Sequence, residues 1–262
     1  MTKTLNINGL KVSIYNEPVS MGKAAADFVE KKLNDAIGSK GSANLILATG
    51  ASQFTFLKAL KNKNIDWQKV VVFHLDEYKG ISASHPASFR KYLKDRILNS
   101  INPKHIYFLN GDAEDIDQEM NRYTEELTKH PIDIACIGIG ENGHIAFNDP
   151  GVADFHDPKL VKVVELDEAC RNQQLGEGWF KTFEDVPKEA LTLTVTAILS
   201  SKTISCVVPD LRKAEAVYNA LYADINTHCP ASILRTHSQT VMFLDDASAF
   251  KINKAHKVFN SK

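Results

Sequence analysis

The sequence lacks the features of secreted and membrane proteins. Its first residues, MTKTLNINGLKV, contain no apolar core of a signal peptide. No apolar run approaches the roughly 20 residues of a membrane-spanning helix. The four cysteines form no CxxC pair and have no metal-ligand spacing; they are Cys136, Cys170, Cys206 and Cys229. We therefore expect a protein of a reducing compartment, which we interpret as cytoplasmic, without a metal site.

The sequence also lacks a surplus of charge of either sign. The net charge is −1, and lysines and arginines are scattered along the chain. This distribution gives no electrostatic footprint for nucleic acid or for an anionic membrane, so a small molecule is the expected partner. No composition shift, low-complexity linker or repeat divides the 262 residues. We therefore expect residues 1–262 to form a single domain, which is long enough to bury a sizeable core.

Apolar runs typical of buried strands alternate with segments of helical spacing. The pattern suggests that residues 191–199 begin as a strand and end as a short helix, and that 230–235 form another short helix. The remaining runs predict strands at 10–15, 43–48, 70–75, 105–109, 134–137, 160–166, 203–208 and 240–244, and helices at 21–37, 53–60, 84–97, 115–128, 167–174 and 210–222. This alternation predicts an α/β fold, with a single doubly wound, mostly parallel sheet covered by helices on both faces, as in a modified Rossmann fold.

The loop at residues 137–150, IGIGENGHIAFNDP, is the strongest candidate for a functional site. The apolar run at 134–137 breaks at two glycines, and a polar cluster follows, comprising Glu141, Asn142, His144, Asn148 and Asp149. Ligands of open α/β sheets bind beyond the carboxyl ends of strands, where this loop is predicted to lie. Taken alone, the pattern is equally consistent with a loop whose polar groups satisfy nearby backbone.

Three other segments carry candidate residues. Thr49-Gly50-Ala51-Ser52 joins a predicted strand to a helix, an arrangement that directs backbone N–H groups at an anion, although it is not a GxxxxGK[ST] loop and a plain connection is the alternative. Asp76 and Glu77 follow a strand, where a carboxylate can abstract a proton or simply be solvated. Arg212 and Lys213 begin a predicted helix, where a bound anion would offset their unfavourable interaction with the helix dipole; exposed helix charges are the alternative.

Together these segments resemble the glucosamine-6-phosphate deaminase family, also called glucosamine-6-phosphate isomerase. The resemblance runs in one register from about residue 49 to about residue 245. It rests on LDEY at 75–78, HP at 85–86, LNG at 109–111, GIGENGHIAFNDP at 138–150 and ALT at 190–192.

The resemblance implies conversion of an aldose 2-amino-2-deoxy-6-phosphate into a ketose 6-phosphate with release of ammonia, without a metal or an organic cofactor. It implies that Asp76 is the base that moves the C2 proton and that His144 opens the sugar ring. Asn142 and Asp149 match the positions that orient the histidine. The implied substrate-binding residues are Thr49, Gly50, Ala51, Ser52, Glu77, Arg171 and Lys213, several of them for the phosphate.

The chain departs from the family pattern at three positions. Asn142 stands where some members carry an acid, and Asp149 stands where the family usually has the longer glutamate. The family's phosphate-binding arginine matches Gln174, so we expect Arg171, one helical turn earlier, to replace it. The segments TGAS, DEACRNQQ and CPASILRTHS look closer to the galactosamine-6-phosphate branch. Glucosamine and galactosamine 6-phosphates therefore both remain candidate substrates.

Two alternatives remain open. A 6-phosphogluconolactonase-like hydrolase would share the NGH element and the phosphate turn, but it needs no C2 base, so Asp76 favours the deaminase. A non-catalytic sugar-phosphate sensor of a transcription regulator normally carries a helix-turn-helix, and no basic helix pair precedes the strand at 43–48. The expected partner is thus a small-molecule sugar phosphate and neither nucleic acid nor membrane; the sequence leaves a homo-oligomer open.

Overall fold

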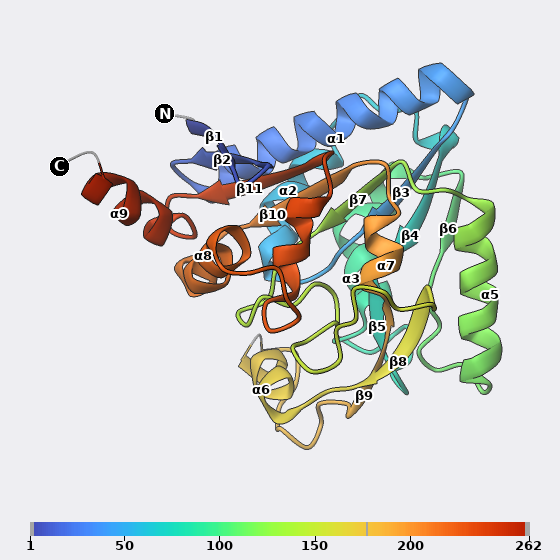
Figure 1. Cartoon of the computed structure of the whole chain (residues 1–262). Helices are drawn as coiled ribbons and strands as arrows, with labels where there is room; N and C mark the ends of the chain where they lie inside the picture. Colours follow the sequence, from blue (N-terminus) through green and yellow to red (C-terminus); the bar gives the residue numbers. More distant parts are fainter. Residues whose placement is uncertain (1–2, 177, 260–262) are drawn as a thin grey trace.

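The computed structural model describes residues 3–176 and 178–259. Its main feature is an eight-stranded sheet in the order β1-β2-β11-β10-β7-β3-β4-β6, in which all neighbouring strands are parallel except the β1–β2 pair (Figure 1). Its strands are β1 (Lys3–Ile7), β2 (Leu10–Tyr15), β3 (Ala43–Leu47), β4 (Val70–His74), β6 (His105–Tyr107), β7 (Ile134–Ile137), β10 (Ile204–Val208) and β11 (Thr240–Asp245). The prediction of a mostly parallel sheet is confirmed.

Helices cover both faces of this sheet. The longer helices are α1 (Pro18–Lys40), α2 (Phe54–Leu60), α5 (Ile116–Lys129), α6 (Glu168–Gly176), α8 (Ala214–Tyr222) and α9 (Phe250–Phe259). Shorter ones are α3 (Phe89–Leu93), α4 (Asn99–Ile101), α7 (Val195–Leu199) and the π-helix η3 (Lys94–Leu98). The 3-10 turns are η1 (Ala51–Gln53), η2 (Trp67–Lys69), η4 (Leu211–Lys213) and η5 (Pro230–Thr236). Within the described residues, no helix is long and apolar enough to cross a membrane.

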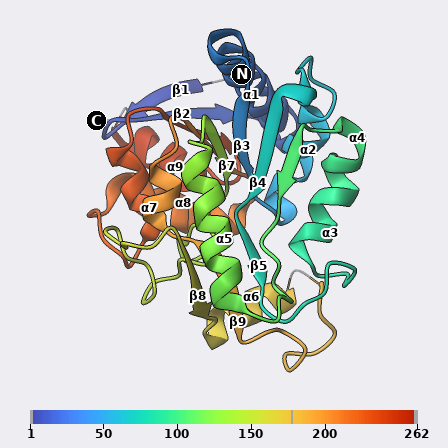
Figure 2. The same cartoon turned by 90° about the vertical axis from the view of Figure 1, so that its right-hand side faces the viewer.

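Side chains on the two faces of the main sheet belong to two separate hydrophobic cores. In β3, Leu45 and Leu47 pack in a cluster with α1 and α2, whereas Ile46 belongs to a cluster with α5, α7 and α8. This alternation follows from the two-residue period of a strand. It explains why β3 reads as a continuous apolar run, since both of its faces are buried. Figure 2 shows the two helical layers on either side of the strands.

The order of the strands reverses between β3 and β7. The chain runs from β3 outward to β4 and β6, returns to β7 on the other side of β3, and then continues outward to β10 and β11. At such a reversal the connections leave in opposite directions, which opens a crevice at the carboxyl ends of the strands. The fold therefore places a binding crevice beside the segments that follow β3, β4, β7, β10 and β11.

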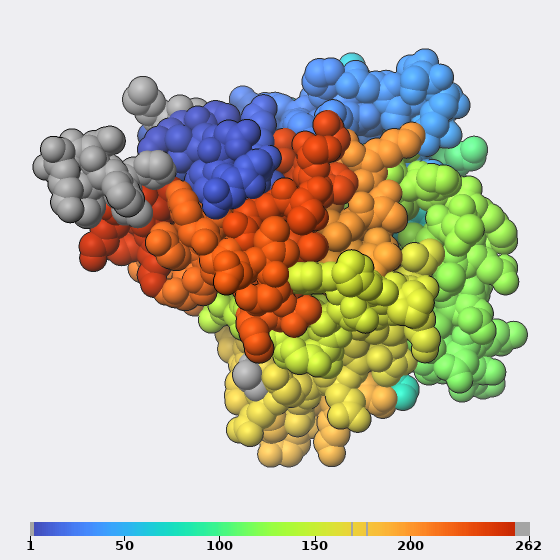
Figure 3. Space-filling model, viewed as in Figure 1, coloured from blue at the N-terminus to red at the C-terminus, as the bar shows by residue number. Residues whose placement is uncertain are grey.

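A second, three-stranded sheet is a feature that the sequence analysis did not predict. Strands β5 (Asp76–Tyr78), β9 (Glu189–Leu193) and β8 (Val161–Glu165) pair antiparallel in the order β5-β9-β8. The predicted strands at 160–166 and 191–199 therefore lie outside the main sheet. The chain enters β5 just after β4, so Asp76 begins a strand of this smaller sheet. In Figure 3 the yellow residues of this region project from the body below the orange and red segments.

Several predicted boundaries were wrong. The helix predicted at 84–97 begins at Phe89, because Ser88 accepts a hydrogen bond from the Lys91 N–H and caps it, while residues 84–88 form turns. The helices predicted at 53–60 and 210–222 are each preceded by a 3-10 turn, η1 and η4, before α2 and α8 begin. Arg212 and Lys213 thus lie in η4, ahead of α8.

Candidate active site

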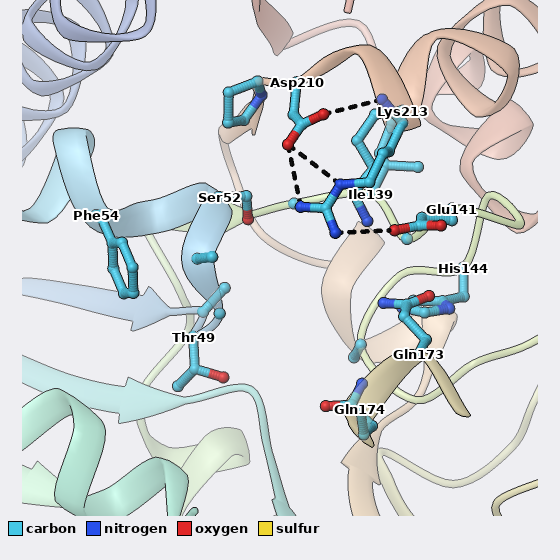
Figure 4. Close-up of a pocket in the computed structure, with 18 of the residues that line it drawn as sticks. Thr49, Ser52, Phe54, Ile139, Glu141, His144, Gln173, Gln174, Asp210 and Lys213 are labelled. Carbon is cyan, nitrogen blue, oxygen red and sulfur yellow. Dashed lines mark hydrogen bonds and ion pairs between the residues drawn. The ribbon is translucent and has the colours of Figure 1, made fainter. Parts of the chain in front are cut away.

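A pocket of about 570 Å³ lies at the reversal of strand order (Figure 4). Its walls come from the segments after β3, β4, β7, β10 and β11, together with α6. Its lining residues include Thr49, Gly50, Ala51, Ser52, Asp76, Gly140, Glu141, His144, Gln174, Asp210, Arg212 and Lys213. The structure therefore brings together predicted site residues that lie far apart in the sequence.

His144 is held by an acid and an amide on its own loop. Its Nδ1 lies 2.8 Å from Oδ1 of Asp149, and Nδ2 of Asn142 donates to the same oxygen at 2.8 Å. Oδ1 of Asn142 accepts the His144 backbone N–H at 3.0 Å. The shorter aspartate therefore reaches the imidazole, while Asn142 contacts the acid and the backbone. Since Nδ1 faces a carboxylate, Nε2 is the nitrogen left to serve a ligand in the pocket.

The environment of Asp149 keeps it ionised. Burial alone would raise the pKa of Asp149, but the hydrogen bond and charge of His144, with further hydrogen bonds from Asn142 and Cys170, lower it below the ordinary value of an aspartate. A buried carboxylate that is stabilised in this way can fix one tautomer of a histidine and stabilise its protonated form.

Glycine is required at two positions of the loop. A Cβ on Gly140 would lie 2.2 Å from Cε1 and Nε2 of His144, so only glycine leaves room for the imidazole. Gly143 has φ +88°, and a Cβ there would lie 2.6 Å from Sγ of Cys229. The Ala231 N–H donates to the Gly143 carbonyl at 2.8 Å, which ties the loop to η5. The glycines of the GIGENGH segment thus serve close packing around His144.

Asp76 is a buried residue that lines the pocket. It is 7% exposed, and its Oδ1 has no hydrogen-bond partner among the described residues. Burial, followed by the nearby Glu77 carboxylate, raises the pKa of Asp76 well above its ordinary value. A raised pKa and an unpaired oxygen are properties of a carboxylate that can accept a proton from a bound ligand.

Glu77, predicted to bind substrate, does not line the pocket. Its fully buried carboxylate accepts hydrogen bonds from Nε of Arg90 at 3.1 Å, from the Ser88 hydroxyl at 2.8 Å and from backbone N–H groups of residues 78, 89 and 90. Arg90 in turn donates to Asp112 at 2.8 Å. With its oxygens fully engaged, Glu77 holds the start of α3 against β5, a structural role that argues against the predicted one.

The turn predicted to bind phosphate forms another part of the pocket wall. Thr49, Gly50, Ala51 and Ser52 all line the pocket, with Gly50 at φ +92°, a conformation that favours glycine. The Tyr92 hydroxyl donates to the Gly50 carbonyl at 2.7 Å and fixes the turn. Lys213, 8% exposed, lines the same pocket from η4. In Figure 4, Ser52, Asp210 and Lys213 lie along the upper wall, and Gln173 and Gln174 along the lower one.

Arg171, predicted to replace the family's phosphate-binding arginine, does not line the pocket either. Its Nη2 donates to the carbonyls of Phe183 and Val186 at 2.7 and 2.9 Å, and its guanidinium lies 3.9 Å from the Phe183 ring centroid. Gln174 does line the pocket, and its Oε1 accepts from the Tyr78 hydroxyl at 2.6 Å. Arg171 therefore braces the chain at 183–186, and the adjacent pocket wall is neutral.

Several pocket residues were not predicted from the sequence. Phe54, Phe89, Phe147 and Leu211 are apolar lining residues, which no polar motif marks. Asp245 is different, because it is the last residue of β11 and lies at the same carboxyl edge as the other site residues; that position was a readable signal. Among residues 3–176 and 178–259, no group of three or more histidine, cysteine, aspartate or glutamate side chains could hold a metal ion.

Comparison with known proteins identifies the family. A family model described as glucosamine-6-phosphate isomerases/6-phosphogluconolactonase matches residues 16–243. A glucosamine-6-phosphate deaminase from Streptococcus agalactiae is 33% identical over 243 residues, which cover 93% of this chain and 100% of that protein. A Streptococcus suis protein of the same name is 32% identical over 243 residues, with the same coverage of 93% and 100%.

Solved structures give the same answer. The structure of a monomeric glucosamine-6-phosphate deaminase matches with a TM-score of 0.82 and 32% identity, over 91% of this chain and 98% of that one. A 6-phosphogluconolactonase from Shewanella baltica matches with a TM-score of 0.74 over 89% of this chain and 96% of that one; at 19% identity it shows likeness of fold alone. The chain belongs to the glucosamine-6-phosphate isomerases/6-phosphogluconolactonase family.

Proposed function

We propose that the protein is an enzyme that converts a hexosamine 6-phosphate and water into a ketose 6-phosphate and ammonia. The observation that carries the proposal is the buried carboxyl group of Asp76, whose Oδ1 has no hydrogen-bond partner among the described residues, in the pocket that His144 of the His144–Asp149 pair also lines. The reaction needs two proton-transfer groups with different tasks, and the two environments differ in the required way. The deaminase names of relatives at 30–33% identity support the same choice.

His144 is proposed to open the sugar ring. The pyranose opens when a proton leaves the anomeric hydroxyl and another reaches the ring oxygen, and one imidazole nitrogen can carry out both transfers. The 2.8 Å contact between Nδ1 and Asp149 leaves Nε2 for this task and stabilises the imidazolium that forms between the two transfers. Asn142, through its contacts with Asp149 and the His144 backbone, is a positioning residue.

Asp76 is proposed to move the proton from C2 to C1. Its ionised form takes the C2 proton of the open-chain substrate, and the resulting acid returns a proton to C1, after which the C2 imine is hydrolysed to the ketone and ammonia. The raised pKa makes Asp76 a stronger base than an ordinary aspartate once it is ionised. The substrate's own ammonium group, bound nearby, would favour that ionised form.

The phosphate is proposed to lie between the turn at 49–52 and η4. Backbone N–H groups of the turn, the Ser52 hydroxyl and the Lys213 ammonium offer donors and positive charge on one wall of the pocket. Glu77 and Arg171 are left out of this proposal. The Glu77 carboxylate is hydrogen-bonded to Arg90 and to the start of α3, and the Arg171 guanidinium is hydrogen-bonded to backbone carbonyls.

The alternatives receive less support. The solved 6-phosphogluconolactonases resemble this chain at 13–19% identity, and a lactone hydrolase has no use for the buried Asp76. A hydrolase of that kind is therefore not favoured. A non-catalytic sensor would have no use for a buried Asp76 either. Galactosamine 6-phosphate stays within the proposal as a second substrate, on the three sequence segments that suggested it.

Three further expectations remain proposals. A cytoplasmic location is supported by four free, buried cysteines. A single domain over residues 1–262 is supported by the parallel pairing of the N-terminal β2 with the C-terminal β11. An oligomer forms no part of the proposal, because a monomeric deaminase is among the similar structures.

The test is to incubate the purified protein with glucosamine 6-phosphate, galactosamine 6-phosphate and 6-phosphogluconolactone. Ammonia and ketose phosphate are followed for the amino sugars, and acid release for the lactone. We expect ammonia and ketose phosphate in equal amounts from at least one amino sugar. The absence of ammonia from both would contradict the proposal, and hydrolysis of the lactone in its place would promote the hydrolase alternative.

A further inference from the structure

Arg212 lines the pocket, and hydrogen bonds hold its guanidinium in place. Its Nε and Nη2 donate to Oδ2 of Asp210 at 3.2 and 3.0 Å, and its backbone N–H donates to Oδ1 at 3.0 Å. On the other edge of the guanidinium, Nη1 lies 3.6 Å from Oε1 of Glu141, which belongs to the loop that carries His144. In Figure 4 dashed lines lead from Asp210 and from Glu141 to this guanidinium.

The turn that presents Arg212 is strained and held in place. Asp210 has φ +86° and ψ 138°, a conformation that a residue with a side chain rarely adopts. Its N–H donates to both carboxylate oxygens of the buried Asp245 at 3.2 Å, and its carboxylate holds Arg212. Such strain persists where the surroundings fix it, and it gathers at ligand sites. The side-chain direction of Arg212 is therefore set by the fold, although the residue is 58% exposed.

Asp210 and Glu141 differ in how closely they approach the Arg212 guanidinium. Asp210 accepts two N–H groups of the guanidinium on its Oδ2, at 3.2 and 3.0 Å, and the Arg212 backbone N–H on its Oδ1 at 3.0 Å, so it is the closer and more fully hydrogen-bonded partner. Glu141 reaches the other edge at 3.6 Å, and its side chain is 41% exposed, so this pair contributes little. An anion that enters the pocket can take the place of Glu141 at Nη1 without disturbing the Asp210 pair.

The pocket wall formed by the described residues of α6 offers no positive charge to a phosphate, so a second cation is needed elsewhere in the pocket. Gln174 occupies the position of the phosphate-binding arginine in the family that this chain resembles, and its side-chain oxygen is held by the Tyr78 hydroxyl. The nearby Arg171 donates its hydrogen bonds to backbone carbonyls. Lys213 is then the other cation among the described pocket-lining residues. A phosphate dianion bound only by Lys213 and neutral donors would remain partly uncompensated in a half-enclosed site.

We infer that Arg212 is the second cation of the phosphate site, and that it binds the substrate's phosphate by exchanging Glu141 for a phosphate oxygen. The inference rests on the proposed function for the identity of the ligand, a sugar phosphate, but its geometry requires only a phosphate group. The second positive charge for the phosphate thus comes from Arg212 in η4 and not from an arginine in α6. This exchange also makes Glu141 a competitor that phosphate displaces, next to the loop that orients His144.

The test measures inorganic phosphate binding to the full-length protein by titration calorimetry, at low and at high salt. For Arg212→Gln we expect binding about tenfold weaker, which corresponds to about 1.4 kcal/mol. For Glu141→Gln we expect binding about threefold tighter, since the competing carboxylate is gone. The double variant should bind as weakly as Arg212→Gln alone, because Glu141 acts only through Arg212. Lys69→Gln, which removes an exposed lysine outside the pocket lining, is the matched control and should bind like the wild type.

A rescue variant separates charge from local structure. Arg212→Gln combined with Gln174→Arg returns a cation to the opposite wall, and we expect it to recover most of the lost phosphate affinity. Unchanged phosphate binding in Arg212→Gln, or no phosphate binding by the wild type, would overturn the inference. Arg212-dependent phosphate binding without any ammonia release would retain the inference and contradict the proposed reaction, so the two failures are distinguishable.

Discussion

Replacing Asp76 by asparagine should abolish activity and stabilise the protein. Asp76 is 7% exposed, its Oδ1 lacks a hydrogen-bond partner among the described residues, and burial raises its pKa well above the ordinary value. An acid whose folded-state pKa is raised binds its proton more tightly in the folded than in the unfolded protein. Stability is therefore lost as the pH rises from about 4 through the folded-state pKa, and the loss is complete above that pKa, where the group is ionised in both states.

The size of the effect follows from the removed charge. Each unit by which the pKa is raised corresponds to about 1.4 kcal/mol of lost stability above that pKa. Asparagine keeps the shape and removes the charge, although its amide also has to be accommodated. Taking the desolvation cost of one unpaired buried polar group, we expect the free energy of unfolding at pH 7 to rise by about 2 kcal/mol. For a protein of this size that is a rise in melting temperature of about 4–8 °C.

The assay is thermal unfolding of Asp76→Asn and wild type between pH 4 and pH 8. The gain in stability of Asp76→Asn should shrink as the pH falls toward 4, because wild-type Asp76 is then protonated in the folded state and increasingly protonated in the unfolded state. Asp245→Asn is the matched control: Asp245 is equally buried at the end of β11, but its carboxylate accepts N–H groups from Asp210 and Ser248, so the same substitution should lower the melting temperature. A lower melting temperature for Asp76→Asn than for the wild type, or an increase in melting temperature that does not depend on pH, would refute this reasoning.

Four further variants test the remaining parts of the site. Asp149→Asn removes the charged partner of His144, a hydrogen bond of about 1.5–3 kcal/mol, and should lower kcat/KM about 10- to 100-fold in steady-state kinetics without a loss of fold. Gly140→Ala places a methyl group on the imidazole and should lower kcat at least as much while the circular dichroism spectrum is kept; normal activity would show that His144 can move without cost. Glu77→Gln breaks a buried ion pair and should lower the free energy of unfolding by about 3 kcal/mol in urea denaturation, whereas an unchanged midpoint would contradict its structural role. Lys213→Ala should chiefly raise KM for the sugar phosphate, and an unchanged KM would remove Lys213 from the phosphate site.

The main sheet was predictable because its strands obey simple rules. Buried parallel strands are continuous apolar runs, and β3, β4, β7, β10 and β11 stand out for that reason. The N-terminal hairpin was missed although it carries a signal: Asn8 and Gly9, with φ +49° and +89°, form a two-residue turn between β1 and β2. An Asn-Gly pair is the residue choice that such hairpin turns favour. The second sheet could not be read, since β5 has only three residues and pairs with a segment more than 100 positions away.

The site was predictable in its parts but not in its contacts. The segments at 49–52, 76 and 138–149 come together because each follows a strand at the same edge of the sheet, which is a property of the fold class. Which neighbouring carboxylate serves the pocket was not readable. Asp76 and Glu77 are adjacent, and only the packing of Arg90 against β5 engages Glu77, while Oδ1 of Asp76 finds no hydrogen-bond partner in the described part of the chain. The same holds for Arg171, which is drawn to carbonyls of a turn at residues 183–186.

The central claim, that Asp76 moves the proton from C2 to C1 of a hexosamine 6-phosphate, is tested most directly by the reaction in D₂O. The ketose phosphate formed by the wild-type protein is analysed by NMR for deuterium at C1, and the remaining substrate for deuterium at C2. We expect ammonia and ketose phosphate from the wild type, with deuterium at C1 only to the extent that the proton on Asp76 exchanges with solvent before its return, and neither exchange at C2 nor product from Asp76→Asn, which still binds the substrate. Exchange at C2 that persists in Asp76→Asn would contradict the account.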